Sequence, residues 1–392
     1  MKKLKNKNHQ EIAIITCCID DWGGSEELWA KSIPMLKQGT RLRLYKNRIN
    51  RSHPEFIKLI QQQVNLIELE PDLSLTQQFN RKIGQLIKRA TIKNYRQNAG
   101  LDRFRDQLKK QPPTLVIVAQ GINFDGLVYA YECHLLNIPY IIIAQKAVDF
   151  YWPYPTDRDY MKQTLLHAKQ CFFVSNHNKT LTEEQFGLRL NNSTVVFNPI
   201  KTKVHILPHP DTANGYKLAC VARLFIIDKA QDILLRIMNK KKWRERPITL
   251  SFIGSGLDEQ GIKEMAQLLA LDNVEFNGFQ EDIDHLWKNY HALLLPSRSE
   301  GLPLSMIEAM SVGRTVIVSN AGGNAEIISD GINGFIAEAT EKDFESAMER
   351  AWELRDQWPE IGKAASLHIT NHLPISPETD FANQLNFLLD EL

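Results

Sequence analysis

The chain has 392 residues, more than one hydrophobic core usually contains, and this length predicts two domains. Hydrophobic residues make up 43% of the chain and charged residues 24%, which excludes a disordered or fibrous protein. No apolar run approaches the about 18 residues needed to span a bilayer. Because the formal net charge is only +1, any strongly charged surface must be local.

The cysteines and the N-terminal residues indicate in which cellular compartment the protein is located. No Cys-x-x-Cys pair occurs, and the five cysteines lie mostly in apolar, strand-like runs, as small buried side chains do in a reducing environment. The apolar stretch at 12–19 is too short for a signal-peptide core followed by a cleavage site. We therefore expect a cytoplasmic protein.

Short apolar runs alternate with helical patterns, which predicts an α/β fold with two parallel sheets covered by helices on both faces. Strands of the first half are expected at 11–18, 41–45, 114–119, 140–144, 171–174 and 194–197. Those of the second half are expected at 217–222, 249–253, 274–277, 292–295, 315–319 and 334–337, with helices at 229–238, 258–269, 282–290, 304–310 and 341–354. Between the two series lie Asn198-Pro199-Ile200 and then the turn-rich stretch 207–215, and we place the interdomain linker over this region, residues 198–215.

The loop after the first strand reads Trp22-Gly23-Gly24-Ser25-Glu26. Two glycines let a ligand or a second domain approach the backbone, and Ser25 is a favourable residue to cap the following helix. We expect Gly23 and Gly24 to face the second domain across an interdomain cleft.

Residues 81–110 carry ten Lys or Arg against two Asp, and their apolar residues recur at helical spacing. This pattern predicts a basic amphipathic helix at the inner membrane face or beside an anionic acceptor, although such helices often present only a solvated charged surface. Only Tyr95 and Phe104 interrupt the charges, and without further stacking rings we expect no nucleic-acid partner.

Polar residues follow the second-half strands where they end, and ligands of open parallel sheets bind there. Arg223 follows one strand and Lys229 lies six residues later, at the start of the expected helix, a pair able to clamp a diphosphate. Gly254 and Gly256 follow the next strand and permit close backbone approach to a ligand, and Gly322-Gly323 repeats this feature. No complete dinucleotide fingerprint accompanies them, which argues against a nicotinamide enzyme.

The most informative stretch follows the strand at 292–295. Pro303 suits the first turn of a helix whose free N–H groups, at Leu304, Ser305 and Met306, favour a phosphate. Glu300 and Glu308 flank that position, and carboxylates beside a phosphate need hydroxyl donors as partners. A ligand with both phosphates and hydroxyls is a nucleotide sugar.

These elements occur in order over residues 217–340 and resemble the nucleotide-binding domain of glycosyltransferase family 4, or group 1, which has the GT-B architecture. The resemblance implies two facing Rossmann-like domains at residues 1–198 and 199–370, with the nucleotide sugar bound by the second. Residues 371–392 are then a C-terminal helix that crosses back to the first domain. It also implies a retaining transferase that is active without a metal or cofactor, consistent with a sequence that shows no metal-ligand spacing.

By the same resemblance, Glu300 contacts hydroxyls of the donor sugar, Glu308 contacts the ribose, and Arg223 with Lys229 neutralises the diphosphate. Backbone N–H groups of Leu304 and Ser305 assist them, and Gly301 completes the loop. Catalysis is then largely electrostatic, with Glu300, Arg223 and Lys229 as the catalytic residues. The acceptor is expected to be a carbohydrate or a lipid-linked glycan, bound by first-domain loops such as 120–123 and 145–155.

Two positions depart from the family's pattern. Gln145 stands after the strand at 140–144, where many members have a His, so the role of that His near the reacting sugar carbon is not carried over. Arg314 replaces a common Pro, and we expect this change to alter only the approach to the next strand. A GT-B-like epimerase and a non-catalytic nucleotide-sugar-binding partner subunit are the alternative interpretations.

Overall fold

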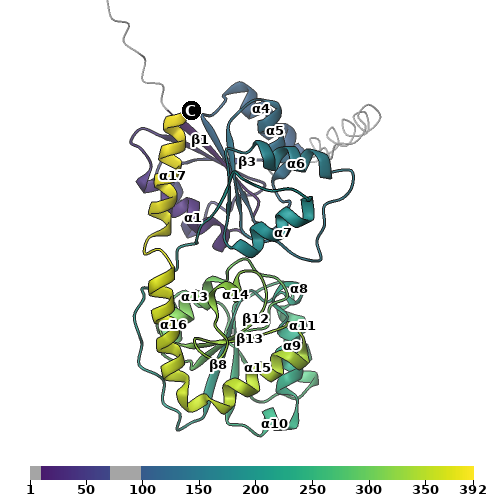
Figure 1. The fold of residues 1–392 in the computed structure, drawn as a ribbon, viewed down its shortest axis with the longest axis vertical. Coiled ribbons are helices and arrows are strands. Elements are labelled where there is room, and N and C mark those ends of the chain that lie inside the picture. The colour runs from purple at the N-terminus through teal and green to yellow at the C-terminus, as the bar shows by residue number, and fades with distance from the viewer. Residues whose placement is uncertain (1–9, 71–98) are drawn as a thin grey trace, which may run out of the picture.

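The computed structural model describes residues 10–70 and 99–392, which form two parallel-sheet units one above the other (Figure 1). Residues 81–98 of the predicted basic helix lie outside the described residues. Its remainder belongs to α4 (Ala99–Lys110), where Leu101, Phe104 and Leu108 are fully buried against the first sheet. In this part the apolar face is occupied by the protein core and is not available to a membrane.

Within the described residues, the first sheet has seven strands in the order β3-β2-β1-β4-β5-β6-β7. They are β1 (Glu11–Thr16), β2 (Arg41–Lys46), β3 (Asn65–Glu68), β4 (Leu115–Gln120), β5 (Tyr140–Ala144), β6 (Gln170–Phe173) and β7 (Ser193–Val195). The edge strand β3 was not predicted, because Leu66 is its only buried residue and its alternation is too short to detect.

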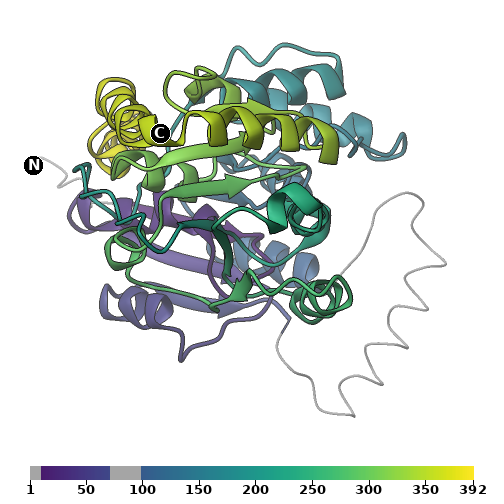
Figure 2. The same cartoon turned by 90° about the horizontal axis from the view of Figure 1, so that it is seen from below.

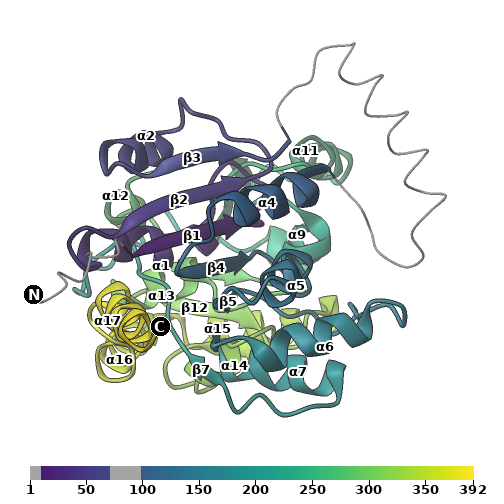
Figure 3. The ribbon, with the colours of Figure 1, turned by 90° about the horizontal axis from the view of Figure 1, so that it is seen from above.

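Helices cover both faces of this sheet, as the views from below and above show (Figures 2 and 3). One face packs against α4, α5 (Leu127–Leu135), α6 (Arg158–His167) and α7 (Asn176–Phe186). The other face packs against α1 (Gly24–Ser32), α2 (Pro54–Gln61) and α17 (Pro377–Glu391). The short η1 (Ile33–Met35) continues directly from α1.

The second sheet has six strands in the order β10-β9-β8-β11-β12-β13 among the described residues. They are β8 (Tyr216–Val221), β9 (Ile248–Ile253), β10 (Val274–Phe276), β11 (Ala292–Leu295), β12 (Thr315–Ser319) and β13 (Phe335–Ala337). The helices between and after them are α8 (Ile226–Lys229), α9 (Gln231–Met238), α10 (Lys241–Arg244), α11 (Glu259–Leu268), α12 (Ile283–Trp287), α13 (Leu304–Ser311), α14 (Asn324–Ile327), α15 (Glu341–Glu353), η2 (Arg355–Gln357) and α16 (Trp358–His372).

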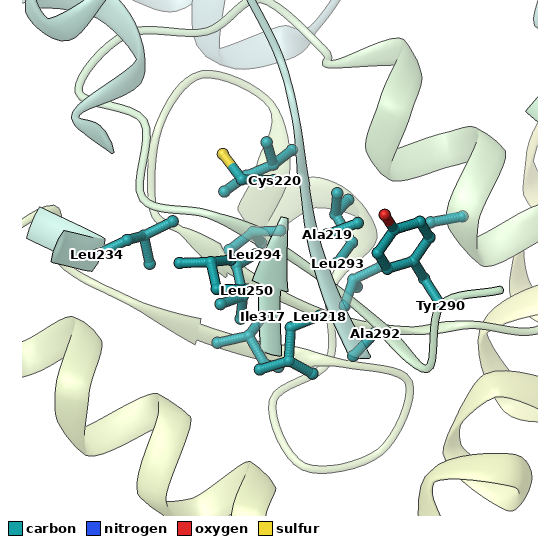
Figure 4. Packing of buried hydrophobic residues seen from close by; sticks show 14 of the residues in the cluster. Leu218, Ala219, Cys220, Leu234, Leu250, Tyr290, Ala292, Leu293, Leu294 and Ile317 are labelled. Carbon is teal, nitrogen blue, oxygen red and sulfur yellow. The ribbon is translucent and has the colours of Figure 1, made fainter. Parts of the chain in front are cut away.

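The middle of the second sheet is apolar on both faces, which is why its strands read as continuous hydrophobic runs. Leu218, Leu250, Leu294 and Ile317 come from four neighbouring strands and pack together in the core (Figure 4). This packing fixes the strand ends, and therefore the loops that follow them.

Helix 229–238 was predicted as one element, and the structure divides it. Ala230 adopts a left-handed conformation, with φ of +52°, between α8 and α9. Lys229 is therefore the last residue of a short helix and not the first of a long one. The periodicity of the apolar residues does not reveal such a break, because it carries no signal for the left-handed conformation of a single alanine.

The C-terminal helix α17 returns to the first sheet and lies beside α1 (Figure 1). The amide of Asn386 accepts a bond from Lys37 N at 3.0 Å and donates one to Met35 O at 3.1 Å, while Phe381 packs edge-on against Phe172 of β6. The chain thus ties the two units together at its end as well as through the linker. The boundaries at residues 198 and 370 stay a prediction.

Arg314 does more than alter the approach to β12, contrary to our expectation. Its side chain is fully buried, and its guanidinium donates to the carbonyl oxygens of Trp287 (2.9 Å), Leu207 (3.1 Å) and Pro208 (2.8 Å). Burial lowers the pKa of Arg314 to about 10. The residue therefore fastens the linker to α12 and to the start of β12.

We predict that Arg314→Met lowers the melting temperature of the protein by about 5 °C or more, because three backbone carbonyl groups, two of them in buried hydrogen bonds, lose their donor. Arg236→Met is the matched control, since Arg236 is exposed on α9 and its ion pair with Asp232 spans 3.8 Å. Circular dichroism melts of the three proteins measure the effect. Equal melting temperatures for both variants would show that the buried guanidinium does not stabilise the linker.

Candidate active site

The two units touch where the loops after their strands meet, and glycine is required at several of these contacts. A Cβ atom at Gly301 would lie 1.9 Å from the carbonyl oxygen of Gln145, and one at Gly323 would lie 2.6 Å from the Cβ of Ser175. A Cβ at Gly24, in the first unit, would come within 3.1 Å of Leu304. The predicted glycines thus permit close approach of the two units.

A buried ion pair lies at this junction. Lys229 Nζ is 2.6 Å from Glu300 Oε1, and Glu300 is only 5% exposed. The two residues follow β8 and β11, which are neighbours in the sheet, so its topology brings together groups that are 71 positions apart in the sequence. The structure therefore brings Lys229 and Glu300 together as an ion pair, while their roles in donor binding stay a prediction.

Arg223 belongs to a second charged group that joins the units. Its guanidinium contacts Asp20 of the first unit at 2.8 Å and Asp228 at 3.2 Å. Lys146, directly after Gln145, reaches across to the same Asp228 oxygen at 2.7 Å. The sequence analysis included Lys146 only within the acceptor loop 145–155 and did not name Asp228. The position of Lys146 just past the end of β5 is the signal that could have placed it at this junction.

Asp228 also shapes the loop that carries Glu300. Its carbonyl oxygen accepts hydrogen bonds from the backbone N–H of Arg298 at 2.8 Å and of Ser299 at 3.2 Å. Arg298 in turn forms a two-pronged ion pair with Asp232, at 3.0 and 3.1 Å. The cations after β8 and the carboxylate after β11 are therefore held on one connected framework.

Gly254 and Gly256 pack against the backbone beside Arg223. Added Cβ atoms would lie 2.2 Å from the carbonyl oxygens of Ala222 and Leu224, respectively. Leu224 N also donates to Ser255 O at 2.9 Å. These glycines are therefore needed to place the loop that carries Arg223, whichever ligand binds here.

The start of α13 presents backbone donors, but one fewer than predicted. Pro303 is the N-cap and not the first helical residue, and its carbonyl oxygen accepts from Met306 N at 3.1 Å. Leu304 and Ser305 carry backbone N–H groups with no acceptor among the described residues. A helix start with two open amides favours an anion.

Glu308 lies on α13, one turn after Leu304, and is almost fully buried. One carboxyl oxygen accepts a hydrogen bond from the backbone N–H of Lys201 in the linker, at 3.1 Å. Burial raises the pKa of the Glu308 carboxyl to about 7, partly offset by this hydrogen bond and by the charge of Lys201.

The first-unit residues differ in part from expectation. Gly23, not Ser25, is the N-cap of α1, because Glu26 accepts from Gly23 N at 3.0 Å and from the Ser25 hydroxyl at 2.7 Å. The amide of Gln145 is paired with the amide of Asn198, at 2.6 and 3.2 Å. Gln145 therefore fastens the beginning of the linker, and its backbone carbonyl, not its side chain, meets Gly301.

Among the described residues, no cluster of three or more His, Cys, Asp or Glu side chains is placed to hold a metal ion. In the same part of the chain, none of the helices combines the length and the apolar character that crossing a bilayer requires.

Solved structures with this arrangement decide the architecture. The Anabaena protein Alr3699/HepE, in complex with UDP-glucose, superposes with a TM-score of 0.71 at 16% identity, covering 98% of this chain and 100% of that chain. Staphylococcus aureus TarM, as a mutant in complex with Fondaparinux, alpha-GlcNAc-glycerol and UDP, gives a TM-score of 0.70 at 13% identity, covering 97% and 99%.

The chain has the GT-B fold.

Sequence comparisons cover parts of this GT-B chain, and the family model lies in its second half. Residues 208–367 match the family model described as glycosyl transferases group 1. An uncharacterized glycosyltransferase of Haemophilus influenzae is 30% identical over 164 residues, 41% of this chain and 44% of that protein. A lipopolysaccharide 1,6-galactosyltransferase of Salmonella typhimurium is 26% identical over 243 residues, 59% and 63% of the two chains. The chain thus spans about half the length of the first curated relatives it matches.

The buried carboxyl of Glu308 makes stability depend on pH. Its pKa of about 7 in the folded protein exceeds the ordinary value of 4.5, so its contribution to stability is complete below pH 4.5 and is lost as the pH rises to 7. We predict that the free energy of unfolding of the unaltered protein falls by on the order of 3 kcal/mol between pH 5 and pH 8 through Glu308. The Glu308→Gln variant, which keeps the acceptor for Lys201 N, is expected to lack this part of the fall.

Urea unfolding of both proteins at the two pH values measures this difference. Glu264→Gln, at an exposed position of α11, is the control and is expected to keep the pH dependence of the unaltered protein. An unchanged pH dependence in Glu308→Gln would contradict the assignment.

Proposed function

We propose that this chain is a group 1 glycosyltransferase that moves a sugar from a nucleoside diphosphate sugar to a hydroxyl group of an acceptor. The observation that carries the proposal is the buried Lys229–Glu300 pair beside Arg223 and the open amides of α13, inside the segment that matches the family model. The relatives give the epimerase alternative no support.

Binding of the donor exchanges partners at the ion pair. The diphosphate takes Lys229 and Arg223 as cationic partners, together with the N–H groups of Leu304 and Ser305. Glu300 is then free to accept hydrogen bonds from hydroxyl groups of the sugar. Because each charge gains a partner as it loses one, the exchange avoids leaving an isolated buried charge, which is costly.

Glu308 is the partner of the ribose hydroxyls in this proposal. Its carboxyl lies one helical turn behind the amides that hold the phosphates, which suits the distance from phosphate to ribose. An ionised carboxylate accepts two hydroxyl bonds, whereas the protonated form accepts less strongly. Donor binding through Glu308 therefore strengthens as the pH rises through 7.

The chemical step breaks the bond between the anomeric carbon and the diphosphate oxygen, which keeps the electron pair. Lys229, Arg223 and the amides of α13 stabilise the charge that grows on this oxygen. The acceptor hydroxyl forms the new bond to the same face of the anomeric carbon, and its proton passes to the departing diphosphate. This sequence gives retention and uses neither a metal nor a cofactor.

We extend the proposal to the class of the substrates, with support from the relatives. A hexose donor is supported by the UDP-glucose bound in the Anabaena structure and by the galactosyltransferase relatives. A glycan or lipid-linked acceptor in polysaccharide assembly is supported by the same lipopolysaccharide enzymes. Membership of family 4 is also part of the proposal and is supported by the ordered motifs of residues 217–340. We place it in the cytoplasm, and its contact with an anionic membrane through residues 81–98 remains part of the proposal.

We predict that Lys229→Met and Glu300→Gln each lower sugar transfer by about 10²-fold or more, because each removes a group that acts on developing charge or on the sugar. Release of nucleoside diphosphate from a panel of UDP-, GDP- and ADP-sugars measures turnover, and circular dichroism checks folding. Lys263→Met is the control, since Lys263 and Glu259 form an ion pair of the same 2.6 Å length on an exposed helix. Unchanged turnover in a folded Lys229→Met protein would refute the assigned role.

A further inference from the structure

Four large aromatic side chains stand in the solvent within five consecutive residues. Phe150, Tyr151, Trp152 and Tyr154 are 51–61% exposed. Exposed aromatic surface of this density is uncommon on a protein that does not use it for binding. We call residues 149–155 the aromatic loop.

The aromatic loop begins beside the proposed donor site. It follows β5, and Lys146, which contacts Asp228 of the second domain, precedes Phe150 by four positions. Four residues span about 14 Å at most, so the Cα atom of Phe150 lies within that distance of the Cα atom of Lys146. The loop therefore begins near the proposed donor site.

Buried side chains hold the loop in place from inside. The fully buried Gln185 donates to the carbonyl oxygens of Val148 and Tyr151, both at 2.8 Å. The ring of Tyr151 also stacks on Phe124, with 6.0 Å between centroids, and the indole N–H of Trp152 bonds the carbonyl oxygen of Asp149 at 3.0 Å. The rings stay exposed because the backbone is fixed, which lowers the entropy that a ligand must remove.

We propose that the aromatic loop is a stacking surface for the pyranose rings of an uncharged glycan acceptor. This inference rests on the proposed transferase function and adds the class of acceptor. The C–H faces of a pyranose carry partial positive charge and fit the negative face of an aromatic ring, while its hydroxyls remain free for polar partners. The half-exposed Tyr151 also carries a hydroxyl group suited to contacts with sugar hydroxyls.

The charges around the loop favour a glycan over a membrane surface. Asp149 and Asp159 are exposed, Asp157 is half-buried, and Arg158 is the one cation between residues 147 and 159. Its guanidinium donates to Gln185 O at 2.6 Å and faces the protein. An anionic leaflet would be repelled by this surface, whereas carboxylates accept hydrogen bonds from sugar hydroxyls.

Saturation-transfer NMR on the full chain tests the inference, with a mixture of maltotriose, chitotriose and mannotriose as the probe and with UDP in the same tube. The test variant is Phe150→Ser/Trp152→Ser/Tyr154→Ser, which leaves the packed ring of Tyr151 in place. Phe387→Ser is the matched control, because Phe387 is an equally exposed ring on the remote helix α17.

We expect the unaltered protein and the Phe387→Ser variant to transfer saturation to pyranose ring protons. In the triple variant we expect the intensity of these signals to fall by about tenfold or more. Signals of UDP are expected to be equal in all three proteins. Equal transfer in the triple variant, or no transfer to any trisaccharide from the unaltered protein, would overturn the acceptor surface. Absent UDP signals would instead count against the proposed donor site.

Co-sedimentation with phosphatidylglycerol vesicles distinguishes a glycan from an anionic membrane surface as the partner of the aromatic loop. No loop-dependent sedimentation is expected. Sedimentation that is lost only in the triple variant would replace the glycan with a membrane surface and overturn the proposal.

Discussion

The structure depends on a buried ion pair that joins the ends of two neighbouring strands. Glu300 is buried and the Lys229 side chain is 18% exposed, so the carboxylate in particular needs a charged or strongly polar partner. Lys229 is that partner in this structure, and in the proposed function a diphosphate takes Lys229 while sugar hydroxyls take Glu300. In that proposal the same requirement selects a ligand that carries both kinds of group.

The contacts between the domains use the same loops as the proposed site. Lys146 and Arg223 share Asp228, while Glu326 of α14 accepts from the backbone N–H of His177, at 2.7 Å, at the start of α7. A diphosphate that draws Arg223 away from its carboxylates changes the balance of these contacts. In the proposed function, donor binding and the approach of the two domains are thus linked through shared charges.

Much of this could be predicted from the sequence, because buried parallel strands leave long apolar runs and the loops after them carry the polar residues. The runs at 140–144, 292–295 and 315–319 match β5, β11 and β12 residue for residue. Position along the chain did not reveal the left-handed Ala230, the pairing of Gln145 with Asn198, or the cross-domain contact of Lys146. These depend on tertiary packing, which overrides local preference and joins residues that no periodicity connects.

A crystal structure of the chain with a bound nucleoside diphosphate sugar tests the central claim most directly. The account predicts that the Lys229–Glu300 bond is broken, with Lys229 Nζ and the amides of Leu304 and Ser305 about 3 Å from phosphate oxygens and Glu300 on sugar hydroxyls. An intact Lys229–Glu300 pair, with the nucleotide sugar bound elsewhere, would contradict it.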